Sequence, residues 1–100
     1  MSAVISTIIV NYNAGESLHS CVDSLLNCPL EIEIIVVDNA STDGSLEALP
    51  GLPSVQIIKN PANVGFAAAC NSGASIASTQ FLLFLNPDCF FKPGALVRLL

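Results

Sequence analysis

Four short apolar runs, separated by polar turns and helical patterns, constrain the fold of this 100-residue chain more than any other feature. The runs VISTIIV (4–10) and IEIIVV (32–37) are rich in β-branched residues, FLLFL (81–85) is apolar throughout, and a shorter run covers residues 55–58. Strands that are apolar on both faces are typical of sheets covered on both sides. The three longer runs therefore predict buried strands, and the fourth predicts a short strand.

Helical patterns lie between and after these runs. Leu18, Cys21, Val22 and Leu25 recur at the spacing of one helix face, and Pro29 ends that helix. The predicted helices cover residues 18–26, 45–49, 65–77 and 95–100. The resulting β-α-β-α-β-α-β-α order predicts one α/β domain over residues 1–100, with a mostly parallel sheet and helices on both faces.

The chain is acidic and poor in cations. Its net charge is −5, and Lys59, Lys92 and Arg98 are its fixed positive charges. Phosphate contacts to nucleic acid need clustered Lys and Arg, so nucleic acid is not an expected partner. An anionic ligand would need a source of positive charge other than these side chains.

The hydrophobic share is high for so small a domain. Hydrophobic residues make up 52% of the sequence and charged residues 11%, whereas an average domain carries about 25% charged residues. We expect one face to meet something else. We favour a second half of the protein, and another copy of the chain in a homo-oligomer is the alternative.

The cysteines and the apolar runs bear on location. Cys21, Cys28, Cys70 and Cys89 form no C-x-x-C pair, and no basic leader precedes the first run. No apolar run reaches the roughly 18 residues needed to span a bilayer. We expect reduced, mostly buried cysteines in a cytoplasmic protein, whose longer parent would work at the inner face of the membrane.

Polar residues gather where three of the apolar runs end. The clusters are Asn11-Tyr12-Asn13, Asp38-Asn39 and Asn86-Pro87-Asp88. Parallel strands bring their carboxyl ends to one edge of the sheet, where open α/β sheets bind ligands. The alternative is that Asn and Asp simply make good turns after strands. Because three clusters would meet at one edge, we favour a binding site.

The predicted site lacks the usual phosphate-binding loops. The sequence contains no G-x-x-x-x-G-K-[ST], and no G-x-G-x-x-G follows the first run. With few cations, a bound diphosphate would need a divalent metal. Asp88 offers carboxylate oxygens of the kind that Mg²⁺ and Mn²⁺ prefer, and such an ion would offset charge on a leaving nucleoside diphosphate.

Four motifs follow one another along nearly the whole chain. They are IIVNYNAGESLHSCVDSLL, IIVVDNASTDGS, NPANVGFAAACNSGA and FLLFLNPD. In order and spacing they resemble the motifs of family 2 glycosyltransferases with the GT-A fold, and bacterial rhamnosyltransferase-type members most closely. The resemblance implies the Rossmann-like, nucleotide-sugar-binding half of that fold.

The resemblance also implies roles for matching residues. Tyr12 would pack on the nucleotide base with Asn13 beside it, and Asp38, together with Asn39, would hydrogen-bond the base. Asp88 matches the last acid of the D-x-D metal motif. The segment that lines the nucleotide and sugar is matched by Asn63, Gly65 and Asn71.

Two positions depart from the family pattern. Asn86 stands where the first acid of D-x-D is expected, so it could be a second metal ligand but brings no charge. Cys70 stands where many relatives carry Arg. Asn86 should lower the affinity of the site for metal. The missing Arg at position 70 should make diphosphate binding depend more strongly on the metal.

The implied reaction is sugar transfer, with inversion, from a UDP- or dTDP-sugar to the hydroxyl of a saccharide or lipid-linked acceptor in bacterial surface polysaccharide synthesis. In the family the catalytic base follows the D-x-D strand, and none can be named here. We expect the chain to bind donor nucleotide without turnover. The alternatives are a nucleotidyltransferase-like enzyme, for which residues 11–15 lack a cation, and a non-catalytic nucleotide-binding or receiver-like module, for which the first strand lacks paired acids.

Three polar residues have simpler structural interpretations. Asp43 is expected to cap the short helix over residues 45–49, and His19 to be a solvated helix residue. Asn71 has two interpretations, a ligand-lining residue or a buried amide that ties two loops together.

Overall fold

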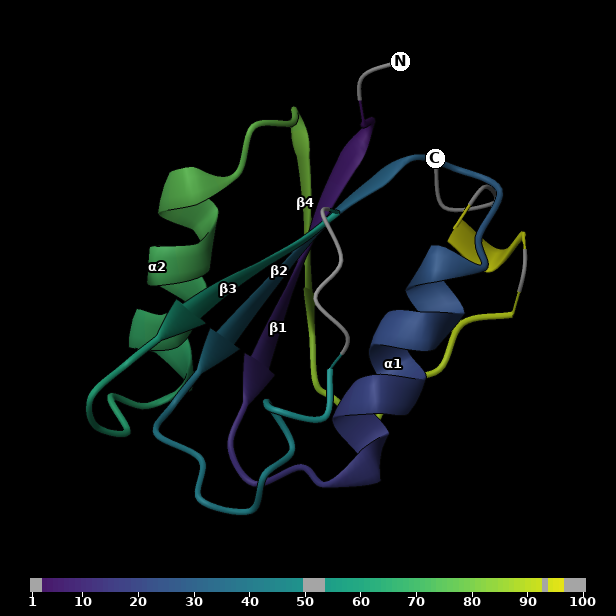
Figure 1. Ribbon diagram of the computed structural model, residues 1–100. Coiled ribbons are helices and arrows are strands. Elements are labelled where there is room, and N and C mark those ends of the chain that lie inside the picture. Colours follow the sequence, from purple (N-terminus) through teal and green to yellow (C-terminus); the bar gives the residue numbers. More distant parts are fainter. Residues whose placement is uncertain (1–2, 50–53, 93, 97–100) are drawn as a thin grey trace.

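The computed structural model describes residues 3–49, 54–92 and 94–96 (Figure 1). The elements in chain order are β1 (Ile5–Asn11), α1 (Glu16–Leu26), β2 (Ile32–Asp38), β3 (Val55–Lys59), α2 (Phe66–Ile76) and β4 (Phe81–Leu85). Both helices are 11 residues long, and no helix of the described residues is long and apolar enough to cross a membrane.

The four strands form one sheet in the order β3-β2-β1-β4, and every neighbouring pair is parallel. Helices α1 and α2 lie on opposite sides of the sheet (Figure 1). The register pairs Asn11 with Asp38 at the carboxyl ends of the two central strands. The predicted parallel sheet with helices on both faces is confirmed.

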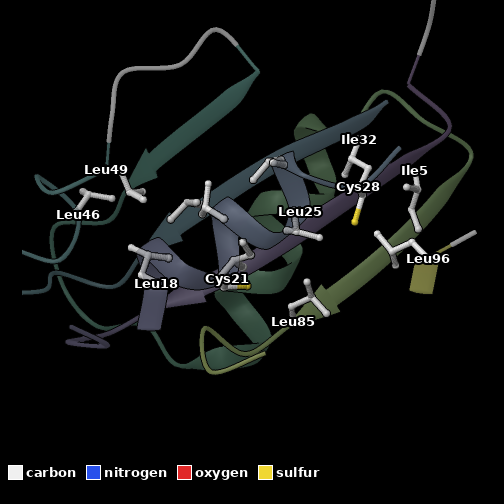
Figure 2. Close-up of a cluster of buried hydrophobic side chains, with 14 residues drawn as sticks. Ile5, Leu18, Cys21, Leu25, Cys28, Ile32, Leu46, Leu49, Leu85 and Leu96 are labelled. Carbon is white, nitrogen blue, oxygen red and sulfur yellow. The ribbon is translucent and has the colours of Figure 1, made fainter. Parts of the chain in front are cut away.

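Alternation along the central strands divides the core into two layers. Ile9 and Val36 point to the α1 side, where they pack with Leu18 and other side chains of that helix (Figure 2). Ile8 and Val37 point to the α2 side. Because both faces of β1 and β2 are covered, nearly every residue of these strands is buried, as their apolar runs predict.

Residues 81–85 form a strand as predicted, but the prediction that this strand is buried is wrong. In the described sheet β4 pairs with β1 alone and forms an edge. Phe81, Leu82 and Phe84 are consequently 53%, 41% and 44% exposed. The sequence pattern indicates an apolar strand but carries no information about which strand lies at the edge.

Residues 45–49 form a hydrogen-bonded turn, so the short helix predicted there is wrong. The Ala48 amide donates to the Gly44 carbonyl and the Leu49 amide to the Leu46 carbonyl, each over 3.1 Å. Five residues give too few hydrogen bonds to offset the cost of starting a helix. Of the helix predicted over residues 95–100, Ala95 and Leu96 are helical, and residues 97–100 lie outside the described part.

The cysteines lie largely as expected. Cys21, Cys28 and Cys70 are buried, Cys89 is half-buried, and all four are free thiols. Burial raises the pKa of the Cys28 and Cys70 thiols, so both stay neutral at ordinary pH.

Helix α2 approaches the sheet closely at Gly73. A Cβ atom added there would lie 2.5 Å from Cγ2 of Ile8 and 3.2 Å from Cγ2 of Val37. Both neighbours belong to the core layer under α2 and have little room to move. Glycine at this position therefore sets the distance between helix and sheet.

We predict that Gly73→Ala destabilises the protein. Helix propensity alone would make this change stabilising by about 1 kcal/mol, whereas overpacking of a tight core costs about 1–3 kcal/mol. The clash with Ile8 should prevail, and urea unfolding should show a net loss of stability. As a matched control, Ser75→Ala on the exposed side of α2 should change stability by less than about 0.5 kcal/mol. A more stable Gly73→Ala protein would contradict the packing argument.

Glu33 ties three strands together at the amino-terminal side of the sheet. Its carboxylate accepts hydrogen bonds from the Ser6 hydroxyl (2.7 Å), the Ser78 amide (2.9 Å) and hydroxyl (2.8 Å), and the Gln56 amide (3.2 Å). Burial alone would raise the pKa of Glu33, but the donors at Ser6, Ser78 and Gln56 outweigh it and hold the pKa below the usual 4.5.

We therefore predict a pH-dependent contribution from Glu33. A carboxyl whose pKa is lowered by folding stabilises the native state fully above pH 4.5, and the contribution disappears as the pH falls through the lowered value. Glu33→Gln should be less stable than the wild type at pH 7, and the difference should shrink in acid. Urea unfolding at pH 7 and at successively lower pH measures it, with the exposed Glu31→Gln as control. A difference that does not change with pH would contradict this role.

A cleft at the carboxyl edge of the sheet

A cleft of about 490 Å³ opens at the carboxyl ends of β1 and β4. It is lined by Val10, Tyr12, Ala14, Ser17, Asn39, Asn63, Gly65, Phe66, Asn86, Pro87 and Asp88. Its volume falls in the usual range of small-molecule sites, about 300–1,000 Å³. The chain leaves β1 toward β2 on one side, while β4 lies on the other, so the strand order reverses beside this cleft. Such reversal points are where open α/β sheets bind ligands.

The structure brings together six of the nine residues predicted for the site. Those that line the cleft are Tyr12, Asn39, Asn63, Gly65, Asn86 and Asp88. The other three, Asn13, Asp38 and Asn71, are absent from its lining. Asn71 lies exposed on α2, so its interpretation as a buried amide is wrong.

Two aromatic side chains are exposed in the cleft. Tyr12 follows β1 and is 55% exposed, and Phe66 in the first turn of α2 is 51% exposed. Exposed rings in a concave site provide flat apolar surface for a planar ligand group. The sequence analysis did not predict Phe66 as a site residue. Its position directly after Gly65, at the start of a helix, could have indicated it.

A buried polar network lies behind the cleft. The Asn11 side-chain amide donates to the Asp38 carboxylate (2.8 Å) and to the hydroxyls of Ser41 (3.1 Å) and Ser45 (2.9 Å). Asp38 also accepts hydrogen bonds from the Ser41 hydroxyl (2.7 Å) and amide (3.1 Å). Asp38 is only 4% exposed. Its carboxylate is thus engaged in holding the loop after β2.

Asn39 connects that loop to the start of α2. Its side-chain amide donates to the Gly65 carbonyl over 3.2 Å, and its side-chain oxygen accepts from Asn60 over 2.9 Å. Asn63 shapes the same turn by accepting a hydrogen bond from the Gly65 amide over 2.9 Å. Gly65 has a φ of 87° and a ψ of 169°, a conformation open essentially to glycine alone.

Asn13 and Asp43 join the loops that follow β1 and β2. The Asn13 side chain accepts a hydrogen bond from the Thr42 amide over 2.8 Å. Asp43 accepts from the amides of Ser45 and Gly15, each over 2.9 Å. The side-chain hydrogen bond of Ser45, followed by these amide bonds, keeps the pKa of Asp43 below its usual value. Asp43 therefore caps a turn, where the sequence predicted that it would cap a short helix.

The starts of both helices face the cleft, through Ala14 and Ser17 at α1 and through Gly65 and Phe66 at α2. Unpaired amides give the start of a helix a partial positive charge. At α1 the negative carboxylate of Glu16, in the first turn, offsets this positive charge. The first turn of α2 has no acidic residue and no side-chain cap. Helix α2 thus offers an anion positive charge without Lys or Arg.

Asn86 and Asp88 supply the metal-ligand chemistry of the cleft. Among residues 3–49, 54–92 and 94–96, no three His, Cys, Asp or Glu side chains group into a metal-binding cluster. One carboxylate and one amide oxygen suit Mg²⁺ or Mn²⁺ but leave most of a coordination shell open. The donor set fits an ion shared with a bound diphosphate. Burial, with Cys89 and Asp88 nearby, raises the pKa of the neighbouring Cys21 thiol to about 12, so this thiol stays protonated.

The sequence has relatives of known function. It is 33% identical over 97 residues to a chondroitin synthase of Pasteurella multocida (strain Pm70), across 92% of this chain and 10% of that protein. It is 34% identical over 102 residues to a poly(ribitol-phosphate) beta-glucosyltransferase of Bacillus spizizenii, across 94% of this chain and 16% of that protein. The chain therefore spans only a small part of these relatives.

Solved structures share the fold. S. aureus TarS 1-349 in complex with UDP-GlcNAc superposes with a TM-score of 0.84 at 23% identity, over 96% of this chain and 30% of that one. A mannosyltransferase of Pyrobaculum calidifontis in complex with GDP-Man and Mn²⁺ has a TM-score of 0.82 at 21% identity, over 91% of this chain and 29% of that one.

The family model described as "Glycosyl transferase family 2" matches residues 6–100. The match includes every strand of the sheet apart from the first residue of β1, and all the residues that line the cleft. The chain belongs to glycosyl transferase family 2.

Proposed function

We propose that this chain is the donor-nucleotide-binding part of an inverting glycosyltransferase. It would serve the transfer of a sugar from a nucleoside diphosphate sugar to an acceptor hydroxyl in bacterial surface polysaccharide synthesis. The observation that carries the proposal is the cleft at the strand-order reversal, which combines two exposed aromatic rings, the uncapped start of α2 and Asp88. Relatives of the chain are named as a chondroitin synthase and as a poly(ribitol-phosphate) beta-glucosyltransferase, which supports this proposal.

The nucleotide base would bind on the side of the cleft formed by the segments that follow β1 and β2. Tyr12 and Phe66 offer rings for packing on a base. Asn39 lines the cleft, but it is only 2% exposed, and its side-chain amide and oxygen are already bonded to Gly65 and Asn60. Asp38 is turned into the buried network. Both residues would therefore act indirectly, by holding the loop after β2 beside the bound base.

Diphosphate recognition falls to Asp88, which follows β4, and to the backbone amides at the start of α2, the helix whose first residue is Phe66. Asp88 and Asn86 would hold Mg²⁺ or Mn²⁺, and the ion would offset charge on the leaving diphosphate. The amides at the start of α2 would orient the phosphates. The complex of a structural neighbour with GDP-Man and Mn²⁺ supports this assignment.

The lining of the cleft offers groups for donor binding but no catalytic base. Asp88 is the single carboxylate in the lining of the cleft, and its role with metal leaves none to deprotonate an acceptor. We therefore propose that the chain binds donor nucleotide without turnover, and sugar transfer by the chain alone would overturn this. The same observation favours a second candidate, a non-catalytic nucleotide-binding module. The free, buried cysteines fit a reducing compartment such as the cytoplasm.

Calorimetry with UDP and dTDP, with and without Mn²⁺, tests the nucleotide and metal assignments. We predict that Mn²⁺ strengthens binding and that Asp88→Ala removes most of this gain, weakening binding in Mn²⁺ at least about tenfold, or ~1.4 kcal/mol. The matched control is Asp23→Ala on the exposed side of α1, which should leave binding unchanged. Binding that is independent of Mn²⁺ and unaffected by Asp88→Ala would contradict the metal role.

The donor sugar can be tested with the same assay. Motif likeness to rhamnosyltransferase-type members makes a dTDP-linked rhamnose one candidate, and the UDP-GlcNAc complex of TarS makes an N-acetylhexosamine another. The donor that binds more tightly than its own nucleoside diphosphate identifies the sugar class.

We also propose that the chain self-associates through its apolar edge. Phe81, Leu82 and Phe84 are exposed on β4, and residues 80–87 contain no charged side chain that would repel a second copy. Unpaired edge strands associate readily. Light scattering should show a mass that rises with protein concentration, and Phe84→Lys should reduce it. Leu26→Lys on α1 is the control, and a monomer at every concentration would contradict the proposal.

A further inference from the structure

A second groove of about 270 Å³ adjoins the cleft at Asp88. It is lined by Glu16, Ser17, Ser20, Pro87, Asp88, Cys89 and Phe90. Ser17, Pro87 and Asp88 line both the groove and the cleft, so the two depressions meet where the diphosphate is proposed to lie. Whatever occupies this groove would sit beside the phosphate end of the donor.

The walls of the groove differ sharply in chemistry. On one side, the first turns of α1 present the carboxylate of Glu16 and the hydroxyls of Ser17 and Ser20, and all three residues are exposed. On the other side stands Phe90, which is 69% exposed, the highest value among the large hydrophobic side chains of the described residues. A flat apolar ring thus faces a row of hydrogen-bonding groups.

The chain holds Phe90 in this exposed position. The Cys89 amide donates to the Asn86 carbonyl over 3.1 Å, and the Phe91 amide donates to the Ser24 hydroxyl of α1 over 3.1 Å. The Phe91 side chain packs against the core under α1. Because both neighbours of Phe90 are tied down, its ring is presented outward by a fixed segment.

We propose that this groove seats a sugar ring. The C–H faces of a pyranose are apolar and stack on an aromatic side chain, while its hydroxyls need polar partners such as a carboxylate and two serine hydroxyls. A protein-binding patch would instead be depleted of charge at its centre. The ring belongs either to the donor sugar or to a free acceptor saccharide, since both present the same chemistry. The inference rests on the proposed donor binding in the cleft.

Proton–nitrogen NMR of the whole chain in Mg²⁺ separates these cases. The probes are UDP, UDP-GlcNAc, dTDP, dTDP-rhamnose and the free methyl glycosides of GlcNAc and rhamnose. The Gly65 amide reports on the cleft, and the amides of Ser20 and Phe90 report on the groove. We expect UDP or dTDP to shift Gly65 without Phe90. A nucleotide sugar that also shifts Ser20 and Phe90 identifies a donor ring, and a free glycoside that shifts them identifies an acceptor ring.

The outcomes distinguish failure of this inference from failure of the proposed function. If Gly65 responds to a nucleotide while Ser20 and Phe90 respond to none of the sugars, the groove is not a saccharide seat. If Gly65 responds to neither nucleotide, donor binding itself is refuted. Shifts of Phe90 with a free glycoside would still support the groove in that case.

Substitutions at Phe90 provide the second arm. Phe90→Ala should weaken binding of the sugar-bearing probe by about three- to tenfold and leave UDP or dTDP binding unchanged. Phe90→Tyr, which retains the ring, should bind like the wild type. Phe81→Ala, which removes another exposed phenylalanine from β4, is the matched control. Equal effects of Phe90→Ala and Phe81→Ala would overturn the assignment, and unchanged nucleotide binding verifies that the variant is folded.

Discussion

The arrangement of the cleft depends on one buried hydrogen bond, from the side-chain amide of Asn11 to the carboxylate of Asp38 over 2.8 Å. These residues lie opposite each other at the carboxyl ends of β1 and β2. A buried carboxylate is costly unless it is fully hydrogen-bonded. Asn11, with the hydroxyl and amide of Ser41, supplies the donors, and the loop after β2 is fixed as a result.

That loop positions much of the binding site. Held by Asp38, it directs Asn39 toward the cleft, and Asn39 binds the carbonyl of Gly65 where α2 begins. Gly65 in turn takes a backbone conformation reserved for glycine, which lets the chain turn from Asn63 into the helix. Further along α2, Gly73 keeps the helix close to Ile8. The start of α2 is therefore located by the polar loop at one point and by close packing at another.

The sequence predicted the strands, both long helices and the convergence of polar strand ends, because hydrophobic periodicity and strand-end position are local properties. It did not predict that β4 lies at an edge of the sheet. Edge position depends on strand order, and the run FLLFL carries no information about strand order. It also did not predict that the side chains of Asp38 and Asn39 are both buried, at 4% and 2% exposure. Polar residues after a strand look alike in sequence, and only the hydrogen bonds of Asp38 with Asn11 and of Asn39 with Gly65 show that they hold loops. The groove at Phe90 depends on contacts between distant segments and left no motif.

The shortage of cations now has a physical account. An anion in the cleft meets no Lys or Arg among the residues that line it. At the position where many relatives carry Arg, Cys70 is buried with a raised pKa and stays neutral. In the proposed donor complex, positive charge would come from the oriented amides at the start of α2 and from an ion held by Asp88. Backbone amides are directional and are lost only by substitution with proline, whereas an ion is exchangeable. In such a site the fold itself would fix the orientation of the diphosphate. The affinity for the diphosphate would depend on the concentration of metal ion.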